Sequence, residues 1–220
     1  MKTGARMKAA IEVLDDVLGR HRPAAVALAD WGRAHRFAGS GDRAAIGNLV
    51  FDVLRRRHSL AARMGSDTPR ALVIAAAPDA FALSPQQVRD AAADPSPHVL
   101  DALTGEEWLA LGRPIDSSEP ASIRGDFPAE FEGSLTRVFG DRLVQEMAAF
   151  AVRAPVGLRA NGLKADREKV MRALQRFDPN PGRISPDAIL IEHPAGRART
   201  PNVEAYPPHG KGSFEVQDEV

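Results

Sequence analysis

The pattern of apolar residues changes once along this 220-residue chain, near Pro155. Before that residue, apolar side chains recur every three or four positions, as in Ala9 and Val13, which is typical of helices that bury one face. After it, residues 156–163 and 188–191 have the character of short strands. The sequence therefore predicts a mainly α chain, with a helical bundle followed by a small α+β subdomain.

Capping signals divide the first part of the chain into helices. The strongest predicted helix follows the breaker at residues 39–41, with Ser40 or Asp42 as its cap. Its apolar side comprises Ile46, Leu49, Val50, Val53, Leu54 and Leu60. Further helix starts are predicted at Thr68-Pro69, at Ser84-Pro85 and at the capping box Thr104–Glu107. Residues 112–128 are rich in Pro, Gly, Ser and acidic side chains, and are predicted to form a loop or an internal linker.

The last residues form a further predicted strand. Phe214 and Val216 alternate with Glu215 and Gln217 after Gly212, and period-two alternation is typical of a strand. No turn, helix or second strand follows this run in the sequence. We therefore expect its partners to lie largely in a further domain, and the α+β subdomain to be incomplete without that domain.

The composition excludes several kinds of site. There is no cysteine, so disulfides, thiolate nucleophiles and cysteine-based zinc sites are impossible. The six histidines lack metal-binding spacing. The first residues lead into Glu12 and Asp15 rather than an apolar core, so no signal peptide is predicted. No stretch approaches the ~20 apolar residues of a membrane span, and a soluble cytoplasmic protein is expected.

Charge is balanced overall but unevenly distributed. Residues 1–70 contain 13 Lys and Arg against 7 Asp and Glu, residues 71–150 contain 5 against 13, and residues 151–220 contain 11 against 9. A basic region beside an acidic one can orient a polyanion. The alternative is that these regions intermix in space, so that their fields cancel.

The densest group of basic side chains is Arg55, Arg56 and Arg57, with Arg43 earlier on the same predicted helix. Guanidinium groups bind phosphate bidentately and stack on bases, so these residues are candidate RNA contacts. The alternative is a solvated helix face near a C-terminus, where cations favour the helix dipole. No aromatic residues are interleaved with this group, so stacking of single-stranded bases is not indicated there.

A second candidate set is Arg159, Asn161 and Lys164. Residues 159 and 161 share one face of a strand, where they could contact RNA backbone or base edges. The alternative is the ordinary polarity of an outward-facing strand. Arg197 and Arg199 add positive charge in a Gly- and Pro-rich loop, for which a solvated role is favoured.

Three stretches of the sequence also carry a family resemblance. Residues 211–219 resemble the segment that leads into the methyltransferase domain of the Sun/Fmu/Nop family of 16S rRNA cytosine-5 methyltransferases. Residues 155–164 are similar to that family's "P-x-x-L-R-x-N-x-L-K" segment, and residues 42–56 resemble its NusB-like helical domain. The three stretches occur in the family's order and span roughly the whole chain.

This resemblance implies a NusB-like RNA-binding domain over residues 1–150. Residues 151–220 would then begin an α+β linking subdomain that leads to an absent C-terminal methyltransferase domain. It also implies 16S-type rRNA as the partner, and S-adenosylmethionine as the cofactor of the full-length protein. The reaction needs a cysteine thiolate and a Gly-rich turn for the methyl donor. The sequence has neither, so this segment is expected to bind no cofactor, to have no catalytic residue and to be inactive alone.

Two other functions remain open from the sequence. The chain could be a stand-alone NusB-like RNA-binding protein of the antitermination type. It could also be a helical protein-interaction module that uses its acidic middle segment as the contact surface. RNA affinity and its dependence on salt would separate the last of these from the RNA-binding functions.

Overall fold

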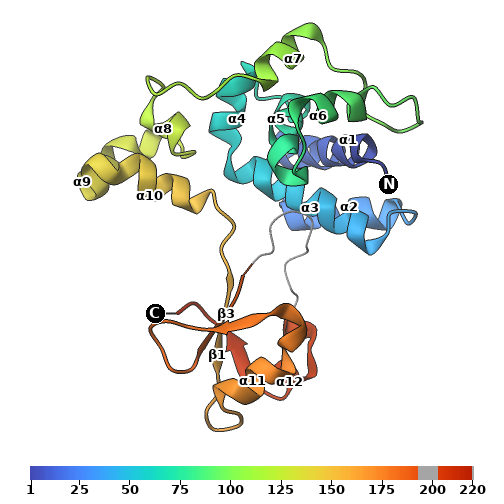
Figure 1. Ribbon diagram of the computed structural model, residues 1–220. Helices are drawn as coiled ribbons and strands as arrows, with labels where there is room; N and C mark the ends of the chain where they lie inside the picture. Colours follow the sequence, from blue (N-terminus) through green and yellow to red (C-terminus); the bar gives the residue numbers. More distant parts are fainter. Residues whose placement is uncertain (193–202, 220) are drawn as a thin grey trace. The chain divides into compact units, whose positions relative to one another are not determined.

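The computed structural model describes residues 1–192 and 203–219, so Arg197 and Arg199 lie outside the described residues. The protein is mainly helical, with a small four-stranded antiparallel sheet in its C-terminal part (Figure 1). It divides into two compact units, Met1–Val152 and Arg153–Val220. Each unit has its own hydrophobic core. No helix in residues 1–192 or 203–219 is both long and apolar enough to cross a membrane.

The first unit is built from helices. They are α1 (Thr3–Leu14), the π-helical turn η1 (Asp15–Gly19), α2 (Ala24–Ala34), α3 (Ser40–Arg55), α4 (Arg57–Met64), α5 (Pro69–Phe81), α6 (Pro85–Ala92), α7 (Gly105–Leu111), α8 (Ala121–Arg124), η2 (Ala129–Phe131), α9 (Glu132–Phe139), η3 (Gly140–Arg142) and α10 (Leu143–Phe150). The helix starts predicted at Thr68, Ser84 and Thr104 are confirmed. The hydroxyls of Thr68, Ser84 and Thr104 each accept a backbone N–H three residues on.

Helix α5 is the centre of this unit. It contacts α1, α3 and α4 (Figure 1), and residues 71–77 are buried on every side. A helix that is apolar all round is stable only inside a core. Met7 of α1 and Ile46 of α3 are fully buried in the same cluster. The apolar side predicted for residues 46–60 is therefore the side that faces this core.

The predicted cap of α3 is wrong, because neither Ser40 nor Asp42 caps it with a side chain. Asp42 instead accepts a 2.8 Å hydrogen bond from Arg6 Nε. Burial opposes ionisation of Asp42, but hydrogen bonds from Arg6 and the N-terminal ammonium group outweigh it, so its pKa lies below the ordinary value. This carboxylate joins α1 to α3 rather than closing a local cap.

The helix also does not run on to Leu60 as predicted, since it breaks at Arg56. Asp126, from the predicted loop 112–128, explains the break. Its carboxylate accepts from the backbone N–H of Ser59 at 2.7 Å and from the Ser59 hydroxyl at 2.6 Å. Ser59 is in the first turn of α4, where N–H groups lack helical partners. The predicted loop thus contains the short helix α8 and supplies a remote cap for α4.

The second unit contains the sheet. Its elements are β1 (Val156–Ala160), α11 (Arg167–Ala173), η4 (Gln175–Phe177), β2 (Pro179–Pro181), β3 (Ala188–Ile191), η5 (Val203–Ala205), α12 (Pro207–Gly210) and β4 (Phe214–Val216). The strands are antiparallel in the order β2-β3-β1-β4. Asp166 caps α11 as predicted, by accepting from Lys169 N at 2.7 Å. The first strand ends at Ala160, before residue 163, because Asn161 starts a turn with a side-chain bond to Leu163 N.

The expectation that the partners of the last strand lie largely in a further domain is wrong for residues 214–216. Strand β4 pairs with β1, with Phe214 opposite Ala160 and Val216 opposite Leu158. Phe214 is buried in the core of the second unit. The alternating pattern predicted the strand correctly. It could not show that β4 would pair with the edge of β1, more than 50 residues earlier.

Candidate nucleic-acid interface

The arginine cluster (Arg55, Arg56 and Arg57) lies where α3 ends and α4 begins. Each guanidinium group has a carboxylate partner. These partners are Asp52 for Arg55, Asp79 at 2.7 Å for Arg56, and Asp67 at 3.1 Å for Arg57. The cluster is therefore less positive than three adjacent arginines suggest, because acidic side chains from three parts of the fold meet it.

Two of these ion pairs are at the surface. The side chains of Asp79 and Asp67 are 63% and 68% exposed, and exposed pairs of this kind contribute only about 0–1 kcal/mol. A phosphate group can therefore replace either aspartate at small cost. The third pair is more enclosed, since the side chain of Asp52 is only 22% exposed. Arg55 Nε is a buried donor without a partner in the described structure.

Arg43 is not part of this cluster. It lies twelve positions before Arg55 on α3, about 18 Å away along the helix axis at 1.5 Å per residue. Its Nε donates to the carbonyl of Ala38 at 2.9 Å, and its guanidinium group lies against Gly32, where an added Cβ would meet Nη1 at 3.5 Å. Arg43 thus braces the turn between α2 and α3.

The second predicted set lies in the second unit and divides by role. Asn161 donates to the carbonyl of Gly212 at 3.0 Å, and Lys164 donates to the carbonyl of Lys211 at 2.9 Å. Both side chains hold the segment that leads into β4. Arg159 is 57% exposed. It donates to Gln217 Oε1 at 3.3 Å and lies 3.7 Å from a carboxylate oxygen of Glu215. Arg159 and Lys164 are both exposed, so a ligand can reach either side chain.

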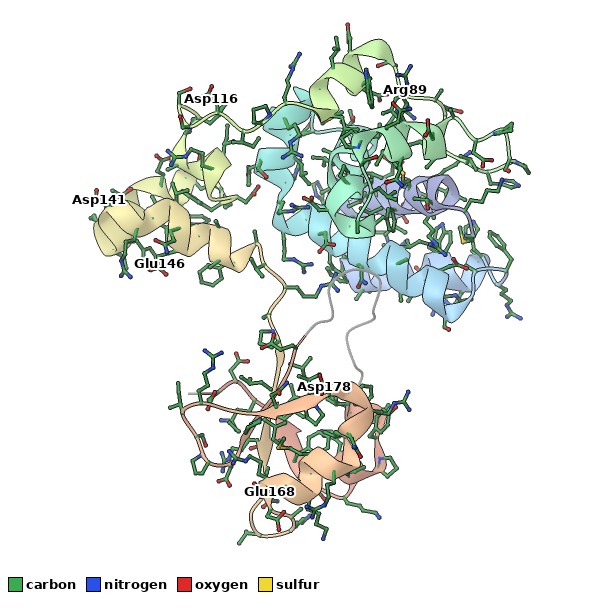
Figure 2. The ribbon with its side chains drawn as sticks, viewed as in Figure 1. Arg89, Asp116, Asp141, Glu146, Glu168 and Asp178 are labelled. Carbon is green, nitrogen blue, oxygen red and sulfur yellow. The ribbon has the colours of Figure 1, made fainter. Side chains whose placement is uncertain are left out.

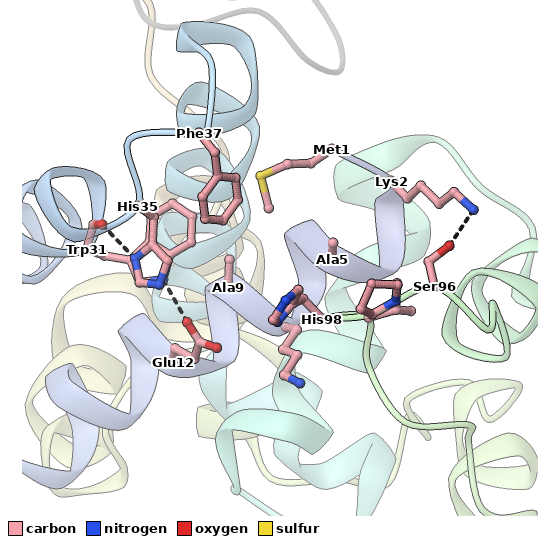
Figure 3. Close-up of a pocket in the computed structure, with 13 residues that line it drawn as sticks. Met1, Lys2, Ala5, Ala9, Glu12, Trp31, His35, Phe37, Ser96 and His98 are labelled. Carbon is pink, nitrogen blue, oxygen red and sulfur yellow. Dashed lines mark hydrogen bonds between the residues drawn. The ribbon is translucent and has the colours of Figure 1, made fainter.

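The sequence did not predict an aromatic pocket in the first unit. This cavity of about 400 Å³ lies between α1, the end of α2 and residues 96–99. Its principal lining residues are Ala5, Ala9, Trp31, His35, Phe37 and His98. In Figure 3, Ala5 and Ala9 form the floor, with Trp31, His35 and Phe37 on one side and His98 on the other. We call this cavity the aromatic pocket.

The rings on the α2 side are held in place. Trp31 Nε1 donates to Glu12 Oε2 at 2.8 Å, and the ring of His35 is stacked on Trp31 at 4.3 Å between centroids. His35 Nδ1 lies 2.8 Å from the carbonyl of Trp31. A carbonyl only accepts, so Nδ1 carries the proton and Nε2 of neutral His35 is an acceptor. Phe37 meets His35 edge-on and is 70% exposed.

The opposite wall is fixed to α1. The backbone N–H of Leu100 donates to the carbonyl of Gly4 at 3.2 Å. A Cβ on Gly4 would lie 2.5 Å from the Val99 side chain, so only glycine permits this approach. His98 has φ of 65°, a conformation that costs a non-glycine residue about 1–2 kcal/mol. Such strain gathers at binding sites.

Charged groups surround the aromatic pocket. Lys2 pairs with Asp94 at 2.9 Å, and hydrogen bonds from Ser96 and Lys2 lower the pKa of Asp94 to about 2. Lys8 also lines the cavity and has no carboxylate within ion-pair distance among the described residues.

The only hint of the aromatic pocket in the sequence was the grouping of Trp31, His35 and Phe37 near one predicted helix end. The opposite wall lies more than 60 residues away.

Comparisons with known proteins identify the fold. No protein-family model and no curated protein matches the chain. The crystal structure of PH0851 matches 98% of this chain, with a TM-score of 0.54 and 15% sequence identity. The match covers 53% of PH0851, so this chain spans about half the length of that protein. At this identity the likeness shows a shared fold, with this chain resembling part of a larger protein.

Proposed function

We propose that this chain is the RNA-recognition part of an S-adenosylmethionine-dependent rRNA cytosine-5 methyltransferase of the Sun/Fmu/Nop type. The observation that carries this proposal is the fold match, which covers nearly all of this chain and about half of a larger protein. The functional part of the proposal is supported by residues 42–56, 155–164 and 211–219, which resemble that family in the same order along the chain. In this proposal the chain supplies RNA binding, and the methyl donor and catalytic cysteine belong to another part of the protein.

The arginine cluster is the proposed phosphate contact. Arg56 and Arg57 are half-buried, but their aspartate partners are exposed, so phosphates can take the place of the carboxylates. Charge-assisted bonds from guanidinium to phosphate are bidentate and stronger than neutral hydrogen bonds. Asp67 and Asp79 would then compete with RNA for the same arginines.

This competition gives a direct test by RNA-binding titration with a 16S rRNA fragment. The double variant Asp67→Asn/Asp79→Asn should bind more tightly, whereas Arg56→Ala/Arg57→Ala should bind more weakly. The matched control is Glu130→Gln/Asp141→Asn, which removes the same charge at exposed sites outside the cluster. Equal gains in the control and the Asp67/Asp79 variant would show a general charge effect and would remove the cluster from the interface.

A second candidate function, a helical protein-interaction module, has one observation in its favour. Val138 and Phe150 are 73% and 72% exposed, and α9 buries none of its residues. The acidic side chains of Asp141 and Glu146 lie on η3 and α10, the elements that follow α9 (Figure 2). Glu146 pairs with Arg142 at 2.9 Å. Absence of measurable RNA affinity would favour this function.

A further inference from the structure

We propose that the aromatic pocket binds one unstacked nucleobase of a single-stranded RNA segment. This inference rests on the proposed RNA-binding function, but it concerns a different surface from the arginine cluster. It assigns to Trp31, His35, Phe37 and His98 a recognition role that the spacing of basic residues did not indicate.

The shape of the pocket suits a flat ring. Its volume of about 400 Å³ is within the range of small-molecule sites. The apolar floor of Ala5 and Ala9 carries no side chain large enough to fill the space (Figure 3). Phe37, at 70% exposure, presents a ring face that the protein leaves uncovered. Proteins that bind single-stranded RNA stack its splayed bases on aromatic side chains in this way.

The rings need little reorganisation before a ligand binds. The bond from Trp31 to Glu12 and the parallel stack of His35 on Trp31 fix the α2 wall. The bond from Leu100 to Gly4 fixes the wall that carries His98. Groups ordered in advance lose less conformational entropy on binding, so an exposed aromatic site of this kind favours a rigid planar ligand.

The polar groups indicate a base attached to a phosphate. His35 Nε2 can accept a hydrogen bond from a ring N–H or an amino group of a base. Glu12 Oε1 can do the same, since Trp31 donates to the other carboxylate oxygen, Oε2. Lys8 lines the same cavity and can meet a phosphate. An apolar peptide would use the floor and rings but would leave Lys8 and these acceptors without a role.

The test uses fluorescence of Trp31, which is one of two tryptophans. In a Trp108→Phe background, Trp31 is the sole reporter. Titration with a short oligoadenylate should quench its emission, whereas an abasic ribose-phosphate oligomer of the same length should bind much more weakly. Phe37→Ala should weaken oligoadenylate binding about 5- to 150-fold, the factor expected for loss of one base–aromatic stack.

The control is Phe150→Ala, because Phe150 is 72% exposed, close to the 70% of Phe37, and does not line the pocket. It should leave affinity unchanged, and circular dichroism should show both variants folded. Equal binding of the abasic oligomer, or no effect of Phe37→Ala, would overturn the pocket while leaving RNA binding through the arginine cluster intact. Failure of every oligomer and rRNA fragment to bind would overturn both proposals.

Discussion

The carboxylate of Glu219 accepts a hydrogen bond from the backbone N–H of Ser185 at 2.8 Å. The same carboxylate accepts from Arg183 N at 3.0 Å and from Ile184 N. Successive backbone N–H groups in a turn form a concave site for an anion. The residues that follow β4 are thereby tied to the loop between β2 and β3.

Replacement of Glu219 by Gln should loosen this tie. A neutral amide keeps one acceptor oxygen but loses the charge that strengthens the bonds from the turn. Amide hydrogen exchange of residues 183–185 and of Phe214–Val216 should become faster. The control Glu215→Gln changes a 62% exposed carboxylate with only a 3.7 Å ion pair, and should leave that exchange unchanged. Identical exchange in the two variants would contradict the proposed tie.

The same carboxylate predicts a dependence on pH. Hydrogen bonds from Ile184 and then Ser185 hold the pKa of Glu219 below its ordinary value of 4.5. A carboxyl group whose pKa is lower in the folded state stabilises the fold fully above its unfolded pKa, and this stabilisation is lost as the pH falls through the folded pKa. The difference in unfolding free energy between wild type and Glu219→Gln should therefore shrink below pH 4.5. A constant difference there would contradict this assignment.

Two glycines in the second unit should not tolerate a side chain. A Cβ on Gly182 would lie 2.4 Å from Ala188 Cβ and 2.5 Å from Glu219 Oε1, and one on Gly157 would lie 2.8 Å from Gln217 O. Alanine at either position should lower the free energy of unfolding by about 1–3 kcal/mol. Gly162→Ala is the control, because nothing lies within 4 Å of its Cβ position. Urea denaturation of the three variants would measure the difference.

The Ser59–Asp126 pair should stabilise the start of α4. Asp126→Ala removes both acceptor bonds, and loss of a helix cap costs about 1–2 kcal/mol. Asp126 also has φ of 54°, which Asn tolerates better than Ala, so Asp126→Asn should cost less. A double-mutant cycle with Ser59→Ala measures the coupling between the Ser59 hydroxyl and Asp126, because the bond from the backbone N–H stays in Ser59→Ala. Additive effects of the two substitutions would show that the hydroxyl bond carries no coupling energy.

The sequence predicted elements whose determinants are close together. Thr68, Ser84, Thr104 and Asp166 each cap a helix through an N–H three residues away, and such bonds can be identified from spacing alone. Asp126 and Asp42 bind partners 67 and 36 residues away. No local pattern shows which distant N–H or guanidinium group a carboxylate will meet, so the break at Arg56 and the missing cap of α3 were not predicted.

The candidate interface shows the same division. Adjacent arginines at 55–57 were easily found, but their aspartate partners come from residues 52, 67 and 79. The bonds of Asn161 to the carbonyl of residue 212 and of Lys164 to that of residue 211 could not be predicted, because these partners are 51 and 47 residues away. The aromatic pocket was missed because folding, rather than spacing, brings His98 opposite Phe37.

Binding of a 16S rRNA fragment as a function of salt tests RNA recognition most directly. The logarithm of the affinity should fall linearly with the logarithm of salt concentration between about 50 and 200 mM. In Arg55→Ala/Arg56→Ala/Arg57→Ala the slope should be shallower by up to about 3, since each lost phosphate contact removes nearly one released counterion. Circular dichroism should show the variant folded. Wild-type binding with an unchanged slope in the variant would exclude the cluster, and no wild-type binding at any salt concentration would contradict the proposed function.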